Sequence, residues 1–369
     1  MHVVLAASRP RRDVDDPESW RRFRILWPHL ETSGAIDCSD ETVWELLIDR
    51  LRYLWLVGDL PGGRSWGTRV EKTWTEMLQT MAGAKRDALR RQLLHLRFNL
   101  GNIMRDQADY EDSYQHNASV LAEQTEMLGD RHPHTLMTAG SLAADLRVLG
   151  RYAEALELDK QTYARWSEDF NDEYPRTLMS RHNLASSYRL MGDYRAAREH
   201  DEAVYLLRRA MKEQLGEDHP YTLGSAASLG RDMRDAGDYE DSIRLLRAVL
   251  EAFTRKYGQL FRGTLNAQVN LAVSLRSAGR AEEASDLLET AYDRLVDTLG
   301  PTGPDTAGCR LSLAVNLLAI GQVERAAGEL NAVHQIYQRG LGRTHPHTLI
   351  CLNNLAAVAR ATGDGRQAH

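Results

Sequence analysis

A short threonine-containing motif recurs along this chain at an almost constant distance, and this regularity constrains the fold more than any other feature. Two nearly identical copies, "LGDRHPHTL" (128–136) and "LGRTHPHTL" (341–349), lie 213 residues apart. The motif occurs six times, with steps of 42, 45, 42, 42 and 42 residues, at Thr135, Thr177, Thr222, Thr264, Thr306 and Thr348. A leucine follows each threonine by seven residues, and a glycine follows that leucine by eight. Such a period indicates a repeat architecture.

Each repeat is predicted to form two helices. Proline opens the first helix because its missing N–H is not needed in a first turn, and glycine ends it in a left-handed turn. Asp130 and Asp218 are expected to cap the free amides of that turn. The longer step, between Tyr194 and Thr222, is expected to lengthen a second helix by about a turn. Neither helix could bury its apolar stripe alone, so we expect an all-α solenoid of stacked antiparallel helix pairs.

Residues at fixed register match a known repeat pattern, L-G/A…G-x-Y-x-x-A, in Leu142, Ala143, Gly150, Tyr152 and Ala155. The chain therefore resembles tetratricopeptide repeat (TPR) proteins. The 42-residue period and the "LGxDHPxTL" linker resemble the kinesin-light-chain-like subtype. The resemblance covers residues 93–369, with about six full helix pairs and a final unpaired first helix. It implies a right-handed superhelix whose first helices line a concave face.

Residues 1–92 are predicted to form a helical cap, in which the second and third helices could make a degenerate repeat. We expect helices over 16–30, 40–60 (stopped at Gly58) and 65–83. Six of the seven tryptophans lie here: Trp20, Trp27, Trp44, Trp55, Trp66 and Trp74. They could fill a capping core or form an exposed docking surface. The "WPHL" helix followed by repeats resembles the C-terminal part of actinobacterial NB-ARC/STAND-type regulators. At the other end, Gly363 would open a turn with no second helix after it, so we expect either a longer protein or a helix supplied by a partner.

Composition and motifs argue against several function classes. A net charge of −6 and a pI of about 6.1 are not those of a general nucleic-acid binder. Three cysteines without a CxxC motif suit a reducing compartment, and no apolar run predicts a membrane span, so a cytoplasmic location is expected. The motifs GxxxxGK[ST], HExxH and GxSxG are absent, so we expect neither an enzyme nor a cofactor. The "HPH" histidines lack the further ligands of a zinc site, so no metal is expected.

Two ladders of polar residues run along the predicted inner face. The residue before each marker leucine is asparagine or serine: Asn99, Ser141, Asn183, Ser228, Asn270, Ser312 and Asn354. The position five residues after that leucine reads Arg105, Arg147, Arg189, Arg234, Arg276, Leu318 and Arg360. Arg231 and His182 would add charge or polarity mid-groove. By resemblance to peptide-binding members of the family, the asparagines would hold a peptide backbone and the arginines a carboxylate.

Duplication alone can also preserve such ladders, and the arginines could pair with acids of the next repeat, such as Glu154, Glu240 or Glu282. We predict a non-enzymatic peptide- or protein-binding scaffold or sensor in signalling, whose partner offers an acidic segment or a free C-terminus. The alternative is the sensor arm of an ATP-switched STAND regulator whose ATPase module lies outside this chain. A third alternative, nucleic-acid binding by the arginines, is opposed by the net charge.

Overall fold

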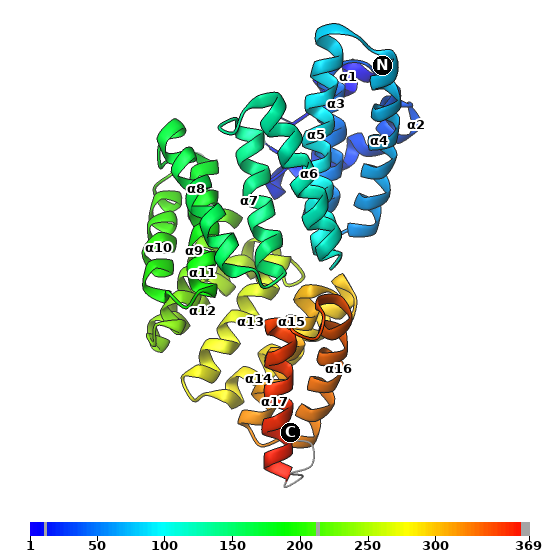
Figure 1. Ribbon diagram of the computed structural model, residues 1–369. Helices are drawn as coiled ribbons and strands as arrows, with labels where there is room; N and C mark the ends of the chain where they lie inside the picture. The colour runs from blue at the N-terminus through cyan, green and yellow to red at the C-terminus, as the bar shows by residue number, and fades with distance from the viewer. Residues whose placement is uncertain (11–12, 212–214, 363–369) are drawn as a thin grey trace. The chain divides into compact units, whose positions relative to one another are not determined.

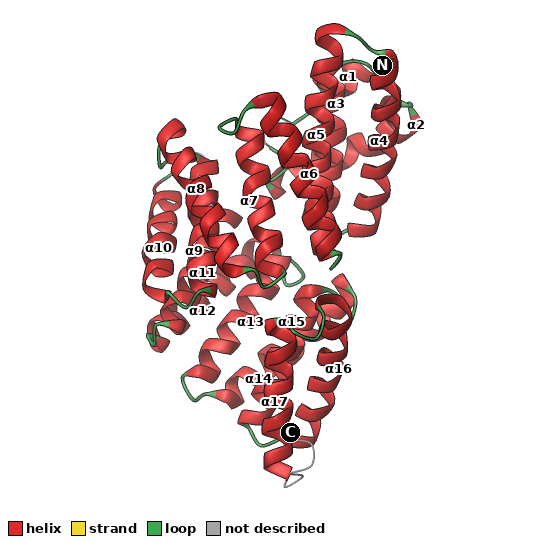
Figure 2. Cartoon of the chain, in the orientation of Figure 1, coloured by secondary structure: helices red, strands yellow, loops and turns green. Residues whose placement is uncertain are grey.

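The computed structural model describes residues 1–10, 13–211 and 215–362, and these ranges contain seventeen α-helices, two short 3₁₀ helices and no strand (Figures 1 and 2). Consecutive helices pack against each other within residues 2–128 and within residues 152–362. The prediction of an all-α solenoid built from stacked antiparallel helix pairs is confirmed. The chain divides into two compact units, residues 1–145 and 146–369.

Helices of the first unit are α1 (His2–Ala7), η1 (Pro17–Ser19), α2 (Trp20–Thr32), η2 (Ala35–Asp37), α3 (Glu41–Leu56), α4 (Leu60–Thr80), α5 (Gly83–Asp106) and α6 (Tyr110–Leu128). Helix α7 (Pro133–Val148) spans the division between the units. Those of the second unit are α8 (Tyr152–Phe170), α9 (Pro175–Leu190), α10 (Tyr194–Ala210), α11 (Pro220–Asp235), α12 (Tyr239–Tyr257), α13 (Arg262–Ser277), α14 (Ala281–Leu299), α15 (Pro304–Ala319), α16 (Val323–Leu341) and α17 (Pro346–Thr362).

The N-terminal helices enclose a core built largely on tryptophan. Trp27, Trp44, Trp66 and Trp74 are buried, and Trp44 meets Trp74 edge-on with 6.2 Å between ring centroids. The remaining two tryptophans of this region are partly buried against the same core. Trp44 donates its indole N–H to the Cys38 carbonyl at 2.7 Å and Trp66 donates to the Leu47 carbonyl at 3.2 Å, whereas the indole N–H groups of Trp27 and Trp74 have no partner among the described residues. The tryptophans therefore form a capping core, the first of the two alternatives.

Helix α4 begins earlier than its sequence predicts. It starts at Leu60 rather than at Ser65, because the Asp59 carboxylate accepts the Gly62 N–H at 3.0 Å and a proline occupies the first turn. Glycines that suggested a loop instead permit close packing. A Cβ at Gly67 would lie 2.4 Å from a side-chain carbon of α5. The glycines of this stretch therefore allow a neighbouring helix to approach closely, and they do not form a loop.

Glycines end the first helices of the repeats as predicted. Gly150, Gly192, Gly237, Gly279 and Gly321 all have φ between 76° and 96°, the left-handed region that only glycine enters without strain. Each allows the chain to reverse into the second helix of the pair.

Three of these helices, α7, α11 and α17, have a histidine side chain as acceptor at their start, and for α11 the predicted Asp218 cap is wrong. In α11 the His219 Nδ1 accepts the Tyr221 N–H at 3.2 Å. Asp218 lies one residue further out, where its carboxylate instead reaches Arg255 at 3.2 Å. His132 and His345 accept the N–H two residues ahead in the same way, at 3.2 and 3.1 Å. The "HPH" histidine is therefore a helix cap.

The second "HPH" copy also joins two distant segments of the second unit. His345 is 5% exposed, and its Nε2 lies 2.7 Å from the carbonyl oxygen of Val148, 197 residues away in the chain. Because its Nδ1 accepts the His347 N–H, the neutral ring carries its proton on Nε2 and donates it to Val148. A Cβ at Gly150 would lie 2.9 Å from Pro346, so the two segments are in close contact.

The extra residues of the 45-residue step do not lengthen a second helix. Helix α10 has 17 residues, whereas α8 and α12 have 19. The extra residues lie after Ala210, where positions 212–214 are outside the described residues. Arg208, near the end of α10, donates to the Tyr221 carbonyl at 3.0 Å and to Ser225 Oγ at 2.6 Å, and so holds the start of α11. The predicted turn at Gly363 also lies outside the described residues. None of the helices in the described ranges is long and apolar enough to cross a membrane.

Candidate functional site

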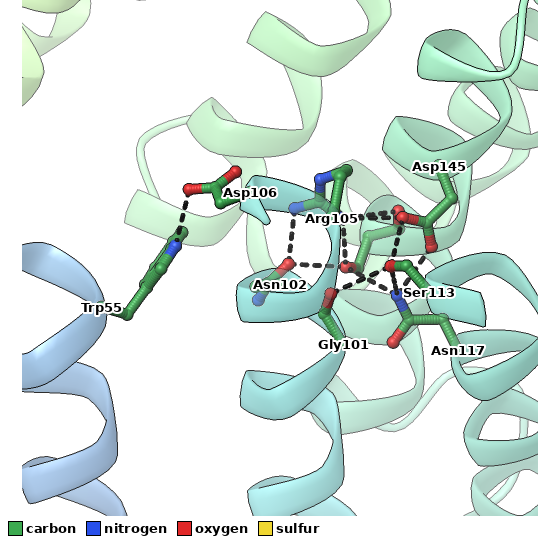
Figure 3. Close-up of polar contacts among 9 residues, drawn as sticks. Trp55, Gly101, Asn102, Arg105, Asp106, Ser113, Asn117 and Asp145 are labelled. Carbon is green, nitrogen blue, oxygen red and sulfur yellow. Dashed lines mark hydrogen bonds and ion pairs between the residues drawn. The ribbon is translucent and has the colours of Figure 1, made fainter. Parts of the chain in front are cut away.

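Arg105, the first arginine of the ladder, is engaged within the first unit. Its Nη1 donates to Asp145 Oδ1 at 3.0 Å and to Ser141 Oγ at 3.1 Å. Asp145 is fully buried and also accepts from Ser113 at 2.8 Å and from Asn117 at 2.6 Å. Figure 3 shows these side chains converging on Asp145 from α5, α6 and α7. Arg105 thus completes an internal network between neighbouring helix pairs.

Arg147 makes a similar set of contacts one repeat further along the chain. It forms an ion pair with the buried Asp159 of α8 and donates to Ser187 Oγ of α9 at 3.2 Å. Ser187 in turn donates to Asp159 at 2.7 Å. Burial raises the pKa of Asp159, and the adjacent guanidinium opposes that rise.

Arg189 lies between two buried carboxylates. Its Nη2 donates to Asp201 at 2.7 Å and its Nε to Asp232 at 2.5 Å, while His182 lies 2.7 Å from the other oxygen of Asp201. Burial raises the pKa of Asp232 to about 7 despite the hydrogen bond from Arg189. Burial acts on Asp201 in the same direction, but His182 and Arg189 outweigh it and hold the pKa of Asp201 below its ordinary value.

The acids that pair with Arg105, Arg147 and Arg189 are not the glutamates suggested by the sequence. Glu154 accepts from Arg151, and Glu240 lies 3.8 Å from Arg280; neither arginine belongs to the ladder. The acids that do bind them are Asp145, Asp159, Asp201 and Asp232. The signal for two of them is a register on the second helices that reads Asn117, Asp159, Asp201, Leu246, Leu288 and Leu330. A carboxylate where later repeats bury leucine needs a buried cation as its partner.

Arg231 on α11 and Arg276 on α13 lack this compensation. Arg231 is half-buried and forms no hydrogen bond or ion pair with any residue that the structure describes. Arg276 donates to the Ser312 carbonyl at 2.9 Å but reaches no carboxylate within the described ranges. Arg234 pairs with Asp235, its neighbour on α11, at 2.8 Å. Burial lowers the pKa of Arg231 and that of Arg276 to about 10, and nearby arginines add to both effects.

The asparagine and serine ladder also divides. The Nδ2 atoms of Asn99 and Asn354 each donate at 2.9 Å to the carbonyl four residues earlier in their own helix. In contrast, Asn183, Ser228 and Asn270 are half-buried, and their side chains have no hydrogen-bond partner among the described residues. The unsatisfied positions therefore lie on the three successive first helices α9, α11 and α13.

The remaining ladder positions offer little to a ligand. Leu318 packs against the apolar core of the second unit, and Arg360 is exposed on α17. No group of three or more histidine, cysteine or acidic side chains in the described part of the chain could hold a metal ion.

Solved structures share this fold at low sequence identity. A Rap protein complexed with competence and sporulation factor matches with a TM-score of 0.58 and 10% identity, covering 99% of this chain and 97% of that one. NprR in complex with its cognate peptide NprX matches with a TM-score of 0.59 and 10% identity, covering 87% and 85%. A putative kinesin light chain repeat protein from Podosopora anserina is 26% identical with a TM-score of 0.45, covering 56% and 95%.

Family models identify the repeats directly. Models described as tetratricopeptide repeat match residues 135–210, 263–338 and 222–259, which together make up just over half of the chain. No curated protein matches the chain. The matched segments contain the helix pairs from α7 to α16. The chain belongs to the tetratricopeptide repeat family.

Proposed function

We propose that this chain is a peptide-binding scaffold or sensor whose ligand lies along the asparagine and serine ladder of its first helices. The observation that carries the proposal is the set of unpartnered side chains Asn183, Ser228 and Asn270 on successive first helices. An amide side chain offers both a donor and an acceptor, which a peptide unit requires. These side chains are half-buried and make no hydrogen bond to the described residues, so their donors and acceptors are available to the backbone of an extended ligand.

The fold relatives support a peptide as the ligand. NprR, which shares the fold, has been solved with its cognate peptide. For this chain we propose an acidic peptide segment or a free C-terminus, because unpaired arginines accompany the free asparagines. We place the protein in the bacterial cytoplasm, in signalling.

The proposal is tested by selecting peptides that bind the wild-type protein from a library of extended synthetic peptides, then measuring Kd for variants. Asn183→Ala/Asn270→Ala is expected to weaken binding at least tenfold, about 1.4 kcal/mol, with little change in Tm. Asn331→Ala, which removes an exposed amide on α16, is the control and leaves Kd unchanged. Equal affinity of the double variant and the wild type would refute binding along the ladder.

The STAND-arm alternative remains a prediction, as does the kinesin-light-chain-like subtype. In that alternative the repeats contact an ATPase module of the same polypeptide rather than a separate peptide. A phosphate-loop sequence encoded directly upstream of Met1 would favour it, and its absence there would count against it.

A further inference from the structure

We infer that Arg231, Arg234 and Arg276 form a binding site for an oxyanion group of the ligand, at one place in the array. This inference rests on the proposed function, because it locates the anionic group of the bound peptide beside Ser228 and Asn270. It also separates these arginines from Arg105, Arg147 and Arg189, which form internal ion pairs.

The three arginines are neighbours. Arg231 and Arg234 lie one turn apart on α11, where side chains three residues apart share a face. Arg276 lies on α13, the next first helix, which packs against α11. The site therefore spans two successive repeats, as an extended ligand crossing the first helices would.

Local acids offset the charge of this cluster only in part: Asp232 and Asp235 lie near Arg231 and oppose the fall in its pKa. Asp232 is bound by Arg189, which also binds Asp201. Asp235 is bound by Arg234 at 2.8 Å. Arg231 and Arg276 therefore form no ion pair with a carboxylate among the residues the structure describes.

The excess charge arises at one repeat and is not a general property of the array. No other repeat has an arginine at the register of Arg231, which reads Asn102, Ala144, Ser186, Val273, Val315 and Ala357 elsewhere. On the second helix that follows, α12, Leu246 occupies the register where Asp201 pairs with Arg189 one repeat earlier. Compared with the preceding repeat, the repeat formed by α11 and α12 therefore has one more arginine on its first helix and lacks the aspartate on its second helix.

Partial burial makes these cations strong anion binders. A half-buried guanidinium without a counter-charge has lost part of its hydration, and each further arginine nearby adds repulsion. An anion that brings two negative charges relieves both costs. Guanidinium groups bind carboxylate and phosphate in paired hydrogen bonds, so the ligand group is either two carboxylates or one phosphate.

The test uses citrate and inorganic phosphate as probes, titrated by calorimetry at low salt. The variant Arg231→Ser/Arg276→Leu introduces the residues that other repeats carry at these registers, serine at 186 and leucine at 318. Its control, Arg247→Ser/Arg325→Leu, removes two exposed arginines from second helices. We expect at least a tenfold loss of citrate or phosphate affinity in the first variant and less than a twofold change in the control.

Equal loss in both variants would show non-specific charge attraction and overturn the site, as would unchanged affinity in Arg231→Ser/Arg276→Leu. Tighter binding of citrate assigns the site to paired carboxylates, and tighter binding of phosphate assigns it to a phosphorylated residue. The single variant Asn183→Ala, on α9 rather than on α11 or α13, distinguishes the two proposals. It should retain anion affinity while losing peptide affinity; retained peptide affinity would refute the ladder and leave the anion site standing.

Discussion

The repeats before and after α11 fill the same buried position of their second helices with different kinds of side chain. One register of the second helices, fully buried throughout, reads Asn117, Asp159 and Asp201 before α11 and Leu246, Leu288 and Leu330 after it. The polar residues require partners, which Arg105, Arg147 and Arg189 or their neighbouring side chains supply. The leucines require none. Later repeats therefore need no arginine to pair with a buried acid at this register, which is why we propose that their arginines serve a ligand.

The two sets of repeats also differ in which interactions stabilise them: buried ion pairs in one set and apolar burial in the other. A buried ion pair is no more stabilising than well-packed apolar residues, but losing one partner is costly because it leaves an uncompensated charge. The polar repeats are thus specified by complementary pairs, whereas the leucine repeats are stabilised by apolar burial alone. Substitutions within each set should have different consequences.

The largest effect is expected for Arg189→Leu. It leaves Asp201 and Asp232 buried without their shared cation, so we expect a loss of about 3–5 kcal/mol in the free energy of unfolding. Chemical denaturation measures it. The triple variant Arg189→Leu/Asp201→Leu/Asp232→Ser carries the residues found at these registers in later repeats, and most of the loss should be recovered. If the triple variant is as unstable as the single one, the residues of the later repeats cannot replace the buried ion pairs, which would contradict this account.

The next effect is a pH dependence to which Asp232 of the polar repeats contributes. The folded pKa of Asp232 is raised from 3.8 to about 7, so the folded state binds this proton more tightly than the unfolded state does. Its contribution therefore favours folding at low pH and is lost as the pH rises from about 4 to 7, on the order of 2 kcal/mol. Urea titrations at pH 5 and pH 8 should show this loss in the wild type and a smaller one in Asp232→Asn. An identical pH dependence in both proteins would contradict the assignment.

A smaller difference is expected between the two copies of "HPH". His132→Ala removes a helix cap, which costs roughly 0.5–1 kcal/mol. His345→Ala removes a cap and also the hydrogen bond to Val148, so its cost should be about 1 kcal/mol larger. Thermal unfolding of the two variants measures the difference. Equal Tm values would show that the contact with Val148 adds no stability.

The repeat fold is readable from sequence because proline, leucine and glycine fall in phase with the helices they start, pack and end. One error arises where a tertiary contact decides local structure, and another where a local cap is made by a neighbouring residue. Close packing keeps Gly67 within α4, and the cap of α11 depends on a histidine ring reaching back to the helix.

The ladders are predictable as patterns, but their partners are not. Arg147 pairs with a residue 12 positions away on the second helix of its own repeat, whereas Arg189 also pairs with one 43 positions away on the next first helix. A sequence period places residues in register without showing which registers meet across a packed interface. Which arginines are free could therefore be found only in three dimensions.

We propose that Arg105, Arg147 and Arg189 stabilise the fold, whereas the arginines on α11 and α13 bind a ligand. The same substitution at two equivalent positions tests it most directly: the free energy of unfolding of Arg147→Leu compared with that of Arg276→Leu. The first strands the buried Asp159 and should cost about 3–5 kcal/mol. The second removes a cation with no carboxylate and should change stability by no more than about 1 kcal/mol, through the bond to Ser312. Equal losses in the two variants would contradict the claim.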